Sequence, residues 1–541
     1  MNIAELIIKK AQDHPQKAAV RAPLQFSKGR YTYEELTFKE LIDKASAIAS
    51  GLEEMGLKKG DKTLVFVRPG LDFPAITFAL FLKGIVPVFI DPGMGRKNLL
   101  KCIAQVKPVG LISVPEVHLM RLLFSSAFKS VKYFVTTGNL KWSKMRTLKS
   151  FMHRDSNIGP RTIDPNDLAA ILFTSGGTGA PKGVEYTHKI FTTQTKMLQE
   201  MFSLTSSDVD LPGFPLFALF TMAMGMTSCI PDMNPSKPAK ANPKKLIQNI
   251  IDNKATFVAG SPAIWEKLAD YCIEHSITLP SVKYLVMFGA PVSIKIHEQF
   301  SKILTNGSTY TPYGATESLP VANISGKEVL ASTASLTKLG KGTCIGKPVN
   351  GMEVKIIKIN DDVIKSTKEM QELSTGEIGE IIVKGDTVTK SYFELPKKTL
   401  EAKIYDQETL WHRIGDIGYF DEEGRLWFCG RKTHRVETKL GLMSSIQSEA
   451  VFNEHPSIKR TALVGIGKMG NQRPGLVVEL SEKGVSKEKV KRDILNTATK
   501  FDHTKDIKDI WFHNSFPVDV RHNIKIDRVK LAKMASAGEL R

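Results

Sequence analysis

The sequence predicts a multi-lobed α/β protein with a β-rich subdomain and a small α+β domain at its C-terminal end. Three observations predict this class. Apolar strand-like runs alternate with helical patterns through most of the chain, the texture changes at about Gly346, and a mixed segment of helices and strands follows Arg431. The chain has 541 residues, enough for roughly two to four domains.

Strands and helices alternate closely in the first part. We expect a strand at Leu64–Val67, a helix at Phe73–Leu82 and a strand at Ile85–Ile90 that ends at Asp91-Pro92-Gly93. Further strand-length apolar runs lie at Val109–Ser113, Tyr133–Thr136, Ala169–Phe173, Thr256–Ala259 and Tyr284–Phe288. Because parallel strands need crossover connections, which are usually helices, this alternation predicts parallel sheets.

After Gly346 the pattern favours antiparallel strands joined by turns that contain glycine, such as Ser374-Thr375-Gly376 and Glu422-Glu423-Gly424. The expected strands are Glu353–Ile359, Gly379–Lys384 and Arg425–Phe428. After Arg431 we expect helices at Ser445–Phe452 and Lys487–Thr499, and strands at Thr461–Val464 and Gly475–Glu479.

The composition excludes several classes of protein. Five cysteines, an odd number without any C-x-x-C pair, argue against a disulfide scaffold or a cysteine zinc site and favour a cytoplasmic protein. Lys and Arg number 75 against 56 Asp and Glu, a net charge of +19. No basic run is long enough for a nucleic-acid tail, so we expect a Lys-rich solvated surface and no specific nucleic-acid partner.

One uncharged stretch, Leu211–Pro231, has the length of a membrane span. Its prolines and glycines disfavour a spanning helix, and we expect a buried segment that lines an apolar pocket. The N-terminal segment carries Glu5 among its apolar residues and lacks a secretory hydrophobic region, so it predicts an amphipathic surface helix.

A glycine-rich segment after the strand at Ala169–Phe173 is the most informative part of the sequence. Glycines let backbone N–H groups approach phosphates, while hydroxyls and one lysine add donors and charge. The segment is not a Walker A loop, because no Ser or Thr follows its lysine. The expected ATP-binding residues here are Thr174, Ser175, Gly176, Gly177, Thr178, Gly179 and Lys182.

This segment resembles the signature of the adenylate-forming superfamily, which includes acyl-CoA synthetases, luciferases and peptide-synthetase adenylation domains. Further family motifs follow in the family's order over nearly the whole chain. They are Phe288-Gly289-Ala290-Pro291, Tyr313-Gly314-Ala315-Thr316-Glu317, Gly415-Asp416-Ile417-Gly418-Tyr419, Gly430-Arg431 and Asn523-Ile524-Lys525-Ile526. The resemblance implies an N-terminal lobe, 1–432, with two α/β sheets, the β-rich subdomain, and the ATP and acyl sites. It also implies a mobile domain, 433–541, that pivots at Thr433.

The resemblance also implies roles for these residues. The turn Gly289-Ala290-Pro291 and the motif Tyr313-Gly314-Ala315-Thr316 would contact ATP, with Tyr313 stacking on adenine and Thr316 donating to the α-phosphate. Asp416 and Arg431 would hold the ribose hydroxyls and phosphate. Glu317 would bind Mg²⁺, which prefers carboxylate and phosphate oxygens. Lys525, with Lys182, would stabilise the transition state.

Departures from the family pattern make coenzyme A doubtful as a substrate. Ala218 replaces the usual gating aromatic or histidine, Glu437 replaces a lysine after the hinge, and Ile524 replaces a glycine. Four blocks are similar to the β-lactone synthetases of long-chain olefin biosynthesis: Asp210–Phe220, Cys229–Met233, Leu426–Val436 and Phe516–Asn523.

That resemblance implies that ATP activates a long-chain 3-hydroxy acid, whose own hydroxyl then displaces AMP and closes a β-lactone. It also implies neighbouring thiolase, reductase and decarboxylase enzymes. His434 is the candidate general base, and His188 is expected to be structural. The expected acyl-pocket residues are Phe214, Phe217, Ala218, Phe220 and Met224. The alternatives are a fatty acyl-CoA or acyl-carrier ligase, a non-catalytic binder and, on charge alone, a nucleic-acid binder.

Overall fold

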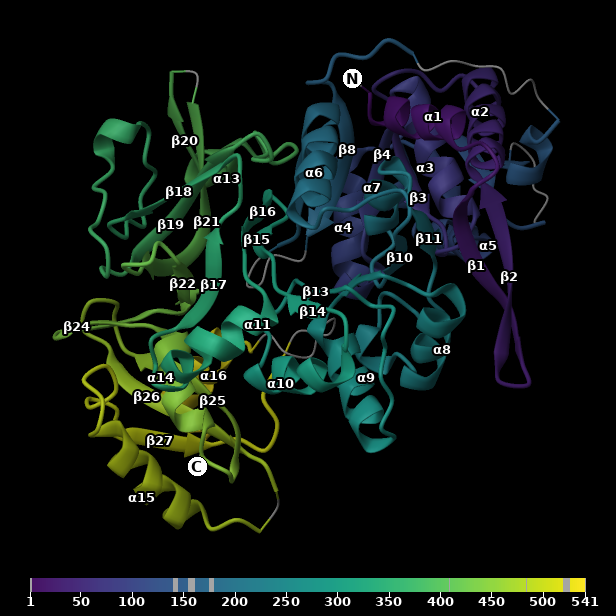
Figure 1. Cartoon of the computed structure of the whole chain (residues 1–541). Coiled ribbons are helices and arrows are strands. Elements are labelled where there is room, and N and C mark those ends of the chain that lie inside the picture. The colour runs from purple at the N-terminus through teal and green to yellow at the C-terminus, as the bar shows by residue number, and fades with distance from the viewer. Residues whose placement is uncertain are drawn as a thin grey trace.

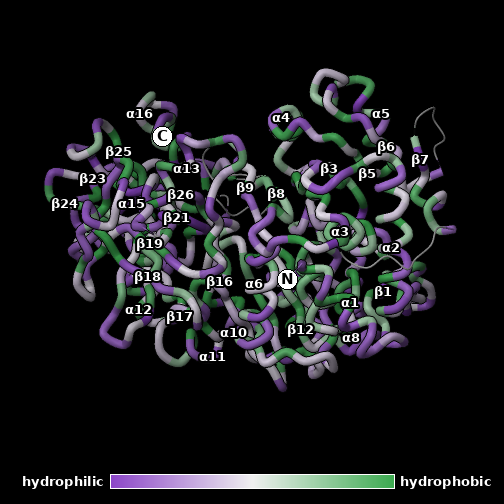
Figure 2. The backbone as a smooth tube through the Cα atoms, turned by 90° about the horizontal axis from the view of Figure 1, so that it is seen from above, coloured by the Kyte–Doolittle hydropathy of each residue, from purple (hydrophilic) through white to green (hydrophobic). Residues whose placement is uncertain are grey.

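The computed structural model describes residues 2–139, 145–153, 161–174, 180–407, 409–482, 484–518 and 526–540. Two α/β sheets form one side of the molecule, and a third sheet and the C-terminal unit form the other (Figures 1 and 2). The predicted strands and helices named above are confirmed within three residues at each end.

The first sheet has the order β7-β6-β5-β3-β4-β8-β9. Its strands are β3 (Lys62–Phe66), β4 (Val86–Ile90), β5 (Gly110–Ser113), β6 (Tyr133–Thr136), β7 (Met145–Thr147), β8 (Leu168–Thr174) and β9 (Lys182–Thr187). All pairs are parallel except β8 with β9. The carboxyl ends of β4, β5 and β8 therefore lie at one edge, where α/β sheets usually bind ligands.

The second sheet has the order β14-β13-β12-β10-β11-β1-β2. Its strands are β1 (Ala18–Ser27), β2 (Arg30–Thr37), β10 (Val209–Pro212), β11 (Thr227–Cys229), β12 (Phe257–Gly260), β13 (Tyr284–Met287) and β14 (Ser308–Tyr310). The pairs are parallel apart from the β1–β2 hairpin. Parallel pairing in both sheets confirms the class predicted from the alternation.

Helices between the two sheets form the largest core cluster. They are α1 (Ile3–Asp13), α2 (Phe38–Glu54), α3 (Asp72–Lys83), α6 (His188–Met201) and α7 (Phe217–Ala223). Helix α3 is buried at every position from Phe73 to Lys83, which explains its continuous apolar sequence. It ends at Gly84, whose φ of +65° suits the left-handed cap.

The outer faces of the two sheets carry separate helices. Helices α8 (Pro243–Asn253), α9 (Pro262–Glu274) and α10 (Ile294–Ile303) cover the second sheet. Helices α4 (Arg96–Val106) and α5 (Pro115–Leu123), with the 3-10 helix η2 (Ser125–Phe128), lie over the first. The uncharged stretch 211–231 folds as part of β10, then α7 and β11. None of the described helices has the length and apolar content needed to cross a bilayer.

The third sheet is antiparallel, as the sequence predicts. Its order is β15-β16-β17-β22-β21-β19-β18, and β20 also pairs with β21. The strands are β15 (Tyr313–Ala315), β16 (Ser318–Asn323), β17 (Thr343–Pro348), β18 (Met352–Ile357), β19 (Gly379–Gly385), β20 (Lys403–Asp406), β21 (Thr409–Phe420) and β22 (Leu426–Arg431). Helices α11 (Gly326–Glu328), α12 (Ala334–Lys338) and α13 (Pro396–Ala402) connect these strands.

The C-terminal unit follows the 3-10 helix η7 (Lys432–His434). It contains the strands β23 (Val436–Thr438), β24 (Gly441–Met443), β25 (Ile458–Ile466), β26 (Arg473–Leu480) and β27 (Asp509–Phe512). Helices α14 (Ser445–Asn453) and α15 (Lys487–Ala498) cover one face of the β25–β27 sheet, and α16 (Arg528–Ser536) covers the other. This unit therefore has cores of its own.

Candidate active site

The glycine-rich segment joins the paired ends of β8 and β9. Thr174 closes β8 and is the ladder partner of Lys182, the first residue of β9. The predicted residues Ser175, Gly176, Gly177, Thr178 and Gly179 lie outside the described residues, as does the side chain of Thr174. The structure therefore places the two strand ends that flank this segment, Thr174 and Lys182, at one edge of the first sheet, and the contacts of the segment stay predictions.

Lys182, Tyr392 and Glu317 form a chain of polar contacts beside this segment. Lys182 Nζ donates to the Tyr392 hydroxyl at 3.2 Å and lies 4.3 Å from the centre of its ring. The Tyr392 hydroxyl donates to Glu317 Oε1 at 2.6 Å. We call this set the Lys182–Tyr392–Glu317 chain.

Burial and mutual contact shift the pKa values of the groups in this chain. Burial lowers the pKa of Lys182, and the Glu317 carboxylate opposes that shift. Burial and the same carboxylate raise the pKa of Tyr392, so its proton stays on the phenol. The hydroxyl can therefore donate to Glu317 and accept from Lys182 at once. It separates a cation and an anion that would otherwise pair directly.

Tyr392 and Lys403 were missed by the sequence analysis. The Phe393 N–H donates to the Gly183 carbonyl at 2.8 Å, and Tyr392 forms a bridge with Val184 of β9. Lys403, fully buried at the start of β20, donates to the Thr389 carbonyl, while the Thr389 N–H donates to the Glu317 carbonyl at 2.9 Å. Burial lowers the pKa of Lys403 to about 7. These contacts fasten the segment 389–393 to the first sheet.

A second chain joins Tyr313, Asp416 and Arg431 within the third sheet. Asp416 on β21 faces Arg431 on β22 in the ladder, and their side chains pair at 2.9 Å. The Tyr313 hydroxyl donates to Asp416 Oδ2 at 2.6 Å. Asp416 raises the pKa of Arg431 as the largest cause, and burial raises the pKa of Tyr313. We call this set the Tyr313–Asp416–Arg431 chain.

The hairpin β15–β16 brings the two chains together. Ala315 pairs with Ser318, so Thr316 and Glu317 form its two-residue turn. A side chain at Gly314 would place its Cβ 2.5 Å from the Ser318 carbonyl, which explains the glycine. The Thr316 carbonyl accepts from the Tyr186 hydroxyl at 2.6 Å. Glu317 lies only four residues after Tyr313, but its carboxylate contacts Tyr392, whereas Tyr313 contacts Asp416.

The predicted adenine turn and acyl residues lie around a chain of phenylalanines. Gly289, Ala290 and Pro291 follow β13, with φ of +86° at Gly289. Phe288, just before them, stacks on Phe217 at 4.5 Å. Phe214 and Phe220 each lie 6.0 Å from Phe217. Ala218, Phe220 and Met224 are all buried in the core between the two sheets.

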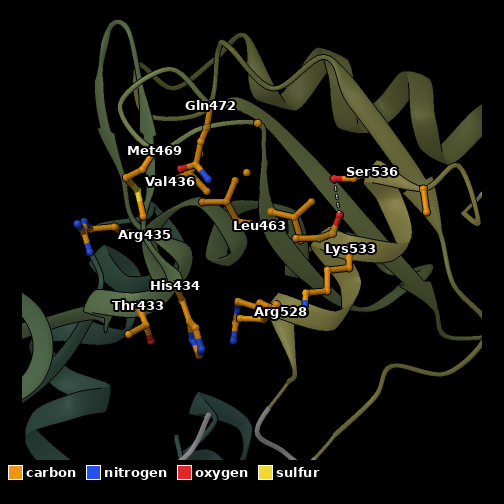
Figure 3. A pocket seen from close by; sticks show the side chains of 16 residues that line it. Thr433, His434, Arg435, Val436, Leu463, Met469, Gln472, Arg528, Lys533 and Ser536 are labelled. Carbon is orange, nitrogen blue, oxygen red and sulfur yellow. Dashed lines mark hydrogen bonds between the residues drawn. The ribbon is translucent and has the colours of Figure 1, made fainter. Parts of the chain in front are cut away.

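His434 lines a cavity of about 560 Å³ between the hinge and the C-terminal unit. Its Nε2 is buried and has no hydrogen-bond partner in the described part of the chain. Burial, Arg528 and Arg431 lower its pKa to about 4. His434 and Arg528 lie next to each other on the cavity wall (Figure 3). The imidazole is therefore neutral above about pH 4, and the same lowered pKa makes it a weak base.

The remaining predicted residues near the hinge have mixed outcomes. Lys525, the predicted catalytic lysine, lies outside the described residues. Glu437 accepts from Arg435 Nε at 2.7 Å and is thus part of a structural ion pair. His188 is buried against α1, where its Nδ1 lies 3.4 Å from the Ile3 N–H, as expected of a structural histidine.

A metal in this site would have few protein ligands. Among the described residues no group of three His, Cys, Asp or Glu side chains is arranged to hold an ion. Glu317 offers one carboxylate beside the predicted phosphate segment. One carboxylate plus phosphate oxygens and water is the coordination that Mg²⁺ commonly has at nucleotide sites, so the residues present fit this ion.

The sequence comparisons identify a family and two relatives that align over nearly the whole chain. The model of the AMP-binding enzyme family matches residues 7–393. An olefin β-lactone synthetase from Xanthomonas campestris pv. campestris is 41% identical, over 99% of this chain and 97% of the relative. A protein of the same name from Stenotrophomonas maltophilia is 41% identical, over 99% of this chain and 98% of the relative.

Solved structures share the fold over nearly the whole chain. The anthranilate CoA ligase AuaEII in complex with anthranoyl-AMP has a TM-score of 0.80 at 17% identity, covering 100% of this chain and 98% of the ligase. The O-succinylbenzoate coenzyme A synthetase of Bacillus subtilis in complex with AMP has a TM-score of 0.75 at 20% identity, covering 97% of each chain. These likenesses establish the predicted fold class.

Proposed function

Because this chain belongs to the AMP-binding enzyme family, we propose that it activates a long-chain 3-hydroxy acid as acyl-AMP and then closes it to a β-lactone. The observation that carries the proposal is the full-length similarity to two olefin β-lactone synthetases. It is supported by the two polar chains that meet at the hairpin β15–β16. One chain offers groups suited to a nucleoside, and the other offers groups suited to phosphates.

ATP binding follows from the family, and the Tyr313–Asp416–Arg431 chain is suited to its nucleoside. Asp416 can accept from both ribose hydroxyls, and the Arg431 fork suits ribose and phosphate oxygens. The side chain of Arg431 is 44% exposed, so part of it is accessible to a ligand. We assign the turn Gly289-Ala290-Pro291 and the ring of Tyr313 to adenine.

The Lys182–Tyr392–Glu317 chain would serve the triphosphate. Lys182 would donate to phosphate oxygens, and Glu317 would hold Mg²⁺, which supplies charge neutralisation to the phosphates when bound. Tyr392 keeps the two charged groups 3.2 Å and 2.6 Å from its own oxygen rather than in contact with each other. We expect Thr174 to Gly179 to add backbone and hydroxyl donors.

In the first step a carboxylate oxygen of the acid attacks the α-phosphorus, and pyrophosphate leaves. Negative charge develops on the α-phosphate oxygens, where donors and cations lower the barrier most. We assign this role to Lys525 and Lys182, with Thr316 donating to the α-phosphate.

In the second step the 3-hydroxyl oxygen attacks the activated carbonyl, AMP leaves and the hydroxyl proton passes to a base. The attack is intramolecular, so the protein needs to orient the chain and exclude water. We assign the acyl wall to Phe214, Phe217, Ala218, Phe220 and Met224, and the proton to Nε2 of His434.

We also propose how the units move and where the protein works. Residues 433–541 would rotate about Thr433, in the short helix η7, to bring Lys525 or His434 to the site. All five cysteines are free and buried, which fits the cytoplasm. A thiolase, a reductase and a decarboxylase would act as neighbours that supply the acid and consume the lactone.

The test is a product assay with ATP, Mg²⁺ and a long-chain 3-hydroxy acid, with and without coenzyme A. We expect pyrophosphate and AMP release without coenzyme A, and a product lighter than the acid by one water. The same acid without its 3-hydroxyl is the matched control, and it should form acyl-AMP but no lactone. AMP release that requires coenzyme A would instead show a ligase, and no pyrophosphate release with any acid would show a non-catalytic binder.

A further inference from the structure

The outer face of α5 exposes a stripe of leucines. Leu119, Leu122 and Leu123 are 53%, 52% and 80% exposed. Their spacing of three and four residues places them on one side of the helix. The helix packs on the first sheet through His118, which is buried and faces the Val135 carbonyl at 3.1 Å, and through Val117 and Met120. The leucines are thus not needed for the core.

Basic side chains surround this stripe. Residues 96–132 contain seven Lys or Arg and a single acidic residue, Glu116. Glu116 is already paired with Arg68 at 2.6 Å. Arg96, Lys97 and Lys101 on α4 are exposed, and within the described ranges no carboxylate lies at ion-pair distance from them. The region therefore carries an uncompensated positive charge next to an apolar stripe.

The two helices form one surface. Both α4 and α5 contact η2, and Figure 2 shows them beside each other at one margin of the molecule. Phe124 directly follows Leu123 in the sequence, and the Arg96 guanidinium lies 5.4 Å from the centre of the Phe124 ring. We call this surface, made of Arg96, Lys97, Lys101, Leu119, Leu122 and Leu123, the α4–α5 face.

We propose that the α4–α5 face docks the enzyme peripherally on an anionic lipid surface. Apolar side chains on one helix face enter the headgroup boundary, and neighbouring cations are attracted to anionic headgroups. A partner that offered only acidic groups would satisfy the cations but would leave the three exposed leucines without an apolar contact. The combination of both features favours a bilayer.

Docking would deliver the substrate, and this consequence rests on the proposed function. A long-chain acid partitions into bilayers, so an enzyme on the bilayer meets it at a higher local concentration. Helix α5 follows β5, whose carboxyl end lies at the same sheet edge as that of β8. Helix α5 and the predicted phosphate segment thus both follow strands that end at the same edge of the first sheet.

Vesicle sedimentation of the full chain tests the proposal without using catalysis. We expect binding to vesicles of phosphatidylcholine with phosphatidylglycerol, little binding to phosphatidylcholine alone, and weaker binding as salt rises. The variant Arg96→Gln/Lys97→Gln/Lys101→Gln should lower the partition coefficient about tenfold or more. The variant Leu119→Ser/Leu122→Ser/Leu123→Ser should lower it while leaving net charge unchanged.

Matched controls keep the test specific. Lys302→Gln/Lys327→Gln/Lys358→Gln removes the same charge from exposed positions elsewhere, and Leu440→Ser removes a leucine that is 79% exposed in the C-terminal unit. Both should bind like the parent. Equal binding to both lipid mixtures, or equal loss in the control variants, would overturn the proposal. So would binding that survives loss of the leucines, which would show a purely electrostatic surface suited to an acidic protein.

Discussion

The two polar chains of the candidate site are built in different ways. The Tyr313–Asp416–Arg431 chain lies within one sheet, and its ion pair joins neighbours in a single ladder. The Lys182–Tyr392–Glu317 chain joins β9 of the first sheet, the segment after β19 and a hairpin turn. The first chain therefore depends on local pairing, and the second depends on how separate sheets are held together.

The largest effect is expected from breaking the first chain. Asp416→Ala removes the acceptor of Tyr313 and the partner of Arg431, and we expect pyrophosphate release to fall about 100-fold or more. The matched control is Asp421→Ala, which breaks the ion pair with Arg425, at 2.7 Å, at the turn of the same two strands. The control should lower the melting temperature but keep activity below it; equal losses of activity would mean that Asp416 is only structural.

A smaller, more selective effect is expected from removing one hydroxyl from each chain. Tyr392→Phe lets Lys182 and Glu317 approach each other and compete with phosphate and Mg²⁺. We expect the Mg²⁺ concentration for half-maximal pyrophosphate release to rise about tenfold. Tyr313→Phe should instead raise the KM for ATP and leave the Mg²⁺ dependence unchanged. If both variants shifted the same parameter, the two chains would not have separate roles.

The hinge histidine should affect only the second step. His434→Ala should leave acyl-AMP formation within about twofold of the parent and slow lactone closure several-fold. Because its pKa is lowered to about 4, the imidazole is unprotonated above that pH, so closure should show no fall linked to His434 between pH 8 and pH 5. His455→Ala, which removes a histidine paired with Asp493, is the control. An equal loss in acyl-AMP formation would contradict the assignment.

The smallest effect on activity is expected at a buried carboxyl that belongs to neither chain. Asp210 accepts from Thr221 and Ser228, and burial raises its pKa to about 7. The folded state therefore holds this proton more tightly than the unfolded state does, and its stabilisation, full below about pH 4, is lost as pH rises to 7. Asp210→Asn should remove up to about 4 kcal/mol of this dependence.

Chemical denaturation at several pH values checks this expectation. The parent should lose free energy of unfolding between pH 4 and pH 7 relative to Asp210→Asn, and both should show similar activity at pH 7. A parallel pH dependence in the two proteins would show that Asp210 is ionised in the folded state.

The difference between the chains also explains what could be predicted from sequence. Tyr313, Asp416 and Arg431 each lie in a short motif of the family, although the apolar pattern predicts only β22 among the strands that carry them. Tyr392 and Lys403 belong to no motif used in the prediction, and their importance arises only when the segment 389–393 pairs with β9. The fold class followed from periodicity, because burial on one or both faces of an element determines its apolar pattern.

The acyl residues illustrate the same limit in the opposite direction. The sequence assigns Phe214, Phe217, Ala218, Phe220 and Met224 to one wall. Ala218, Phe220 and Met224 are 0%, 9% and 2% exposed within the core cluster, so that assignment stays a prediction. An apolar residue of the core and one that contacts a ligand have the same chemistry, so composition alone does not separate them.

The backbone pairing of Tyr392 with Val184 has a consequence for the length of the chain. Thr389, Ser391 and Phe393 each share a backbone hydrogen bond with Glu317, Glu185 or Gly183, so one residue added or removed here shifts the chain relative to these partners. A single added residue between Thr387 and Tyr392 would thus move the phenol away from both Lys182 and Glu317, even if every other residue were kept. Variation in chain length should therefore be excluded before Tyr392.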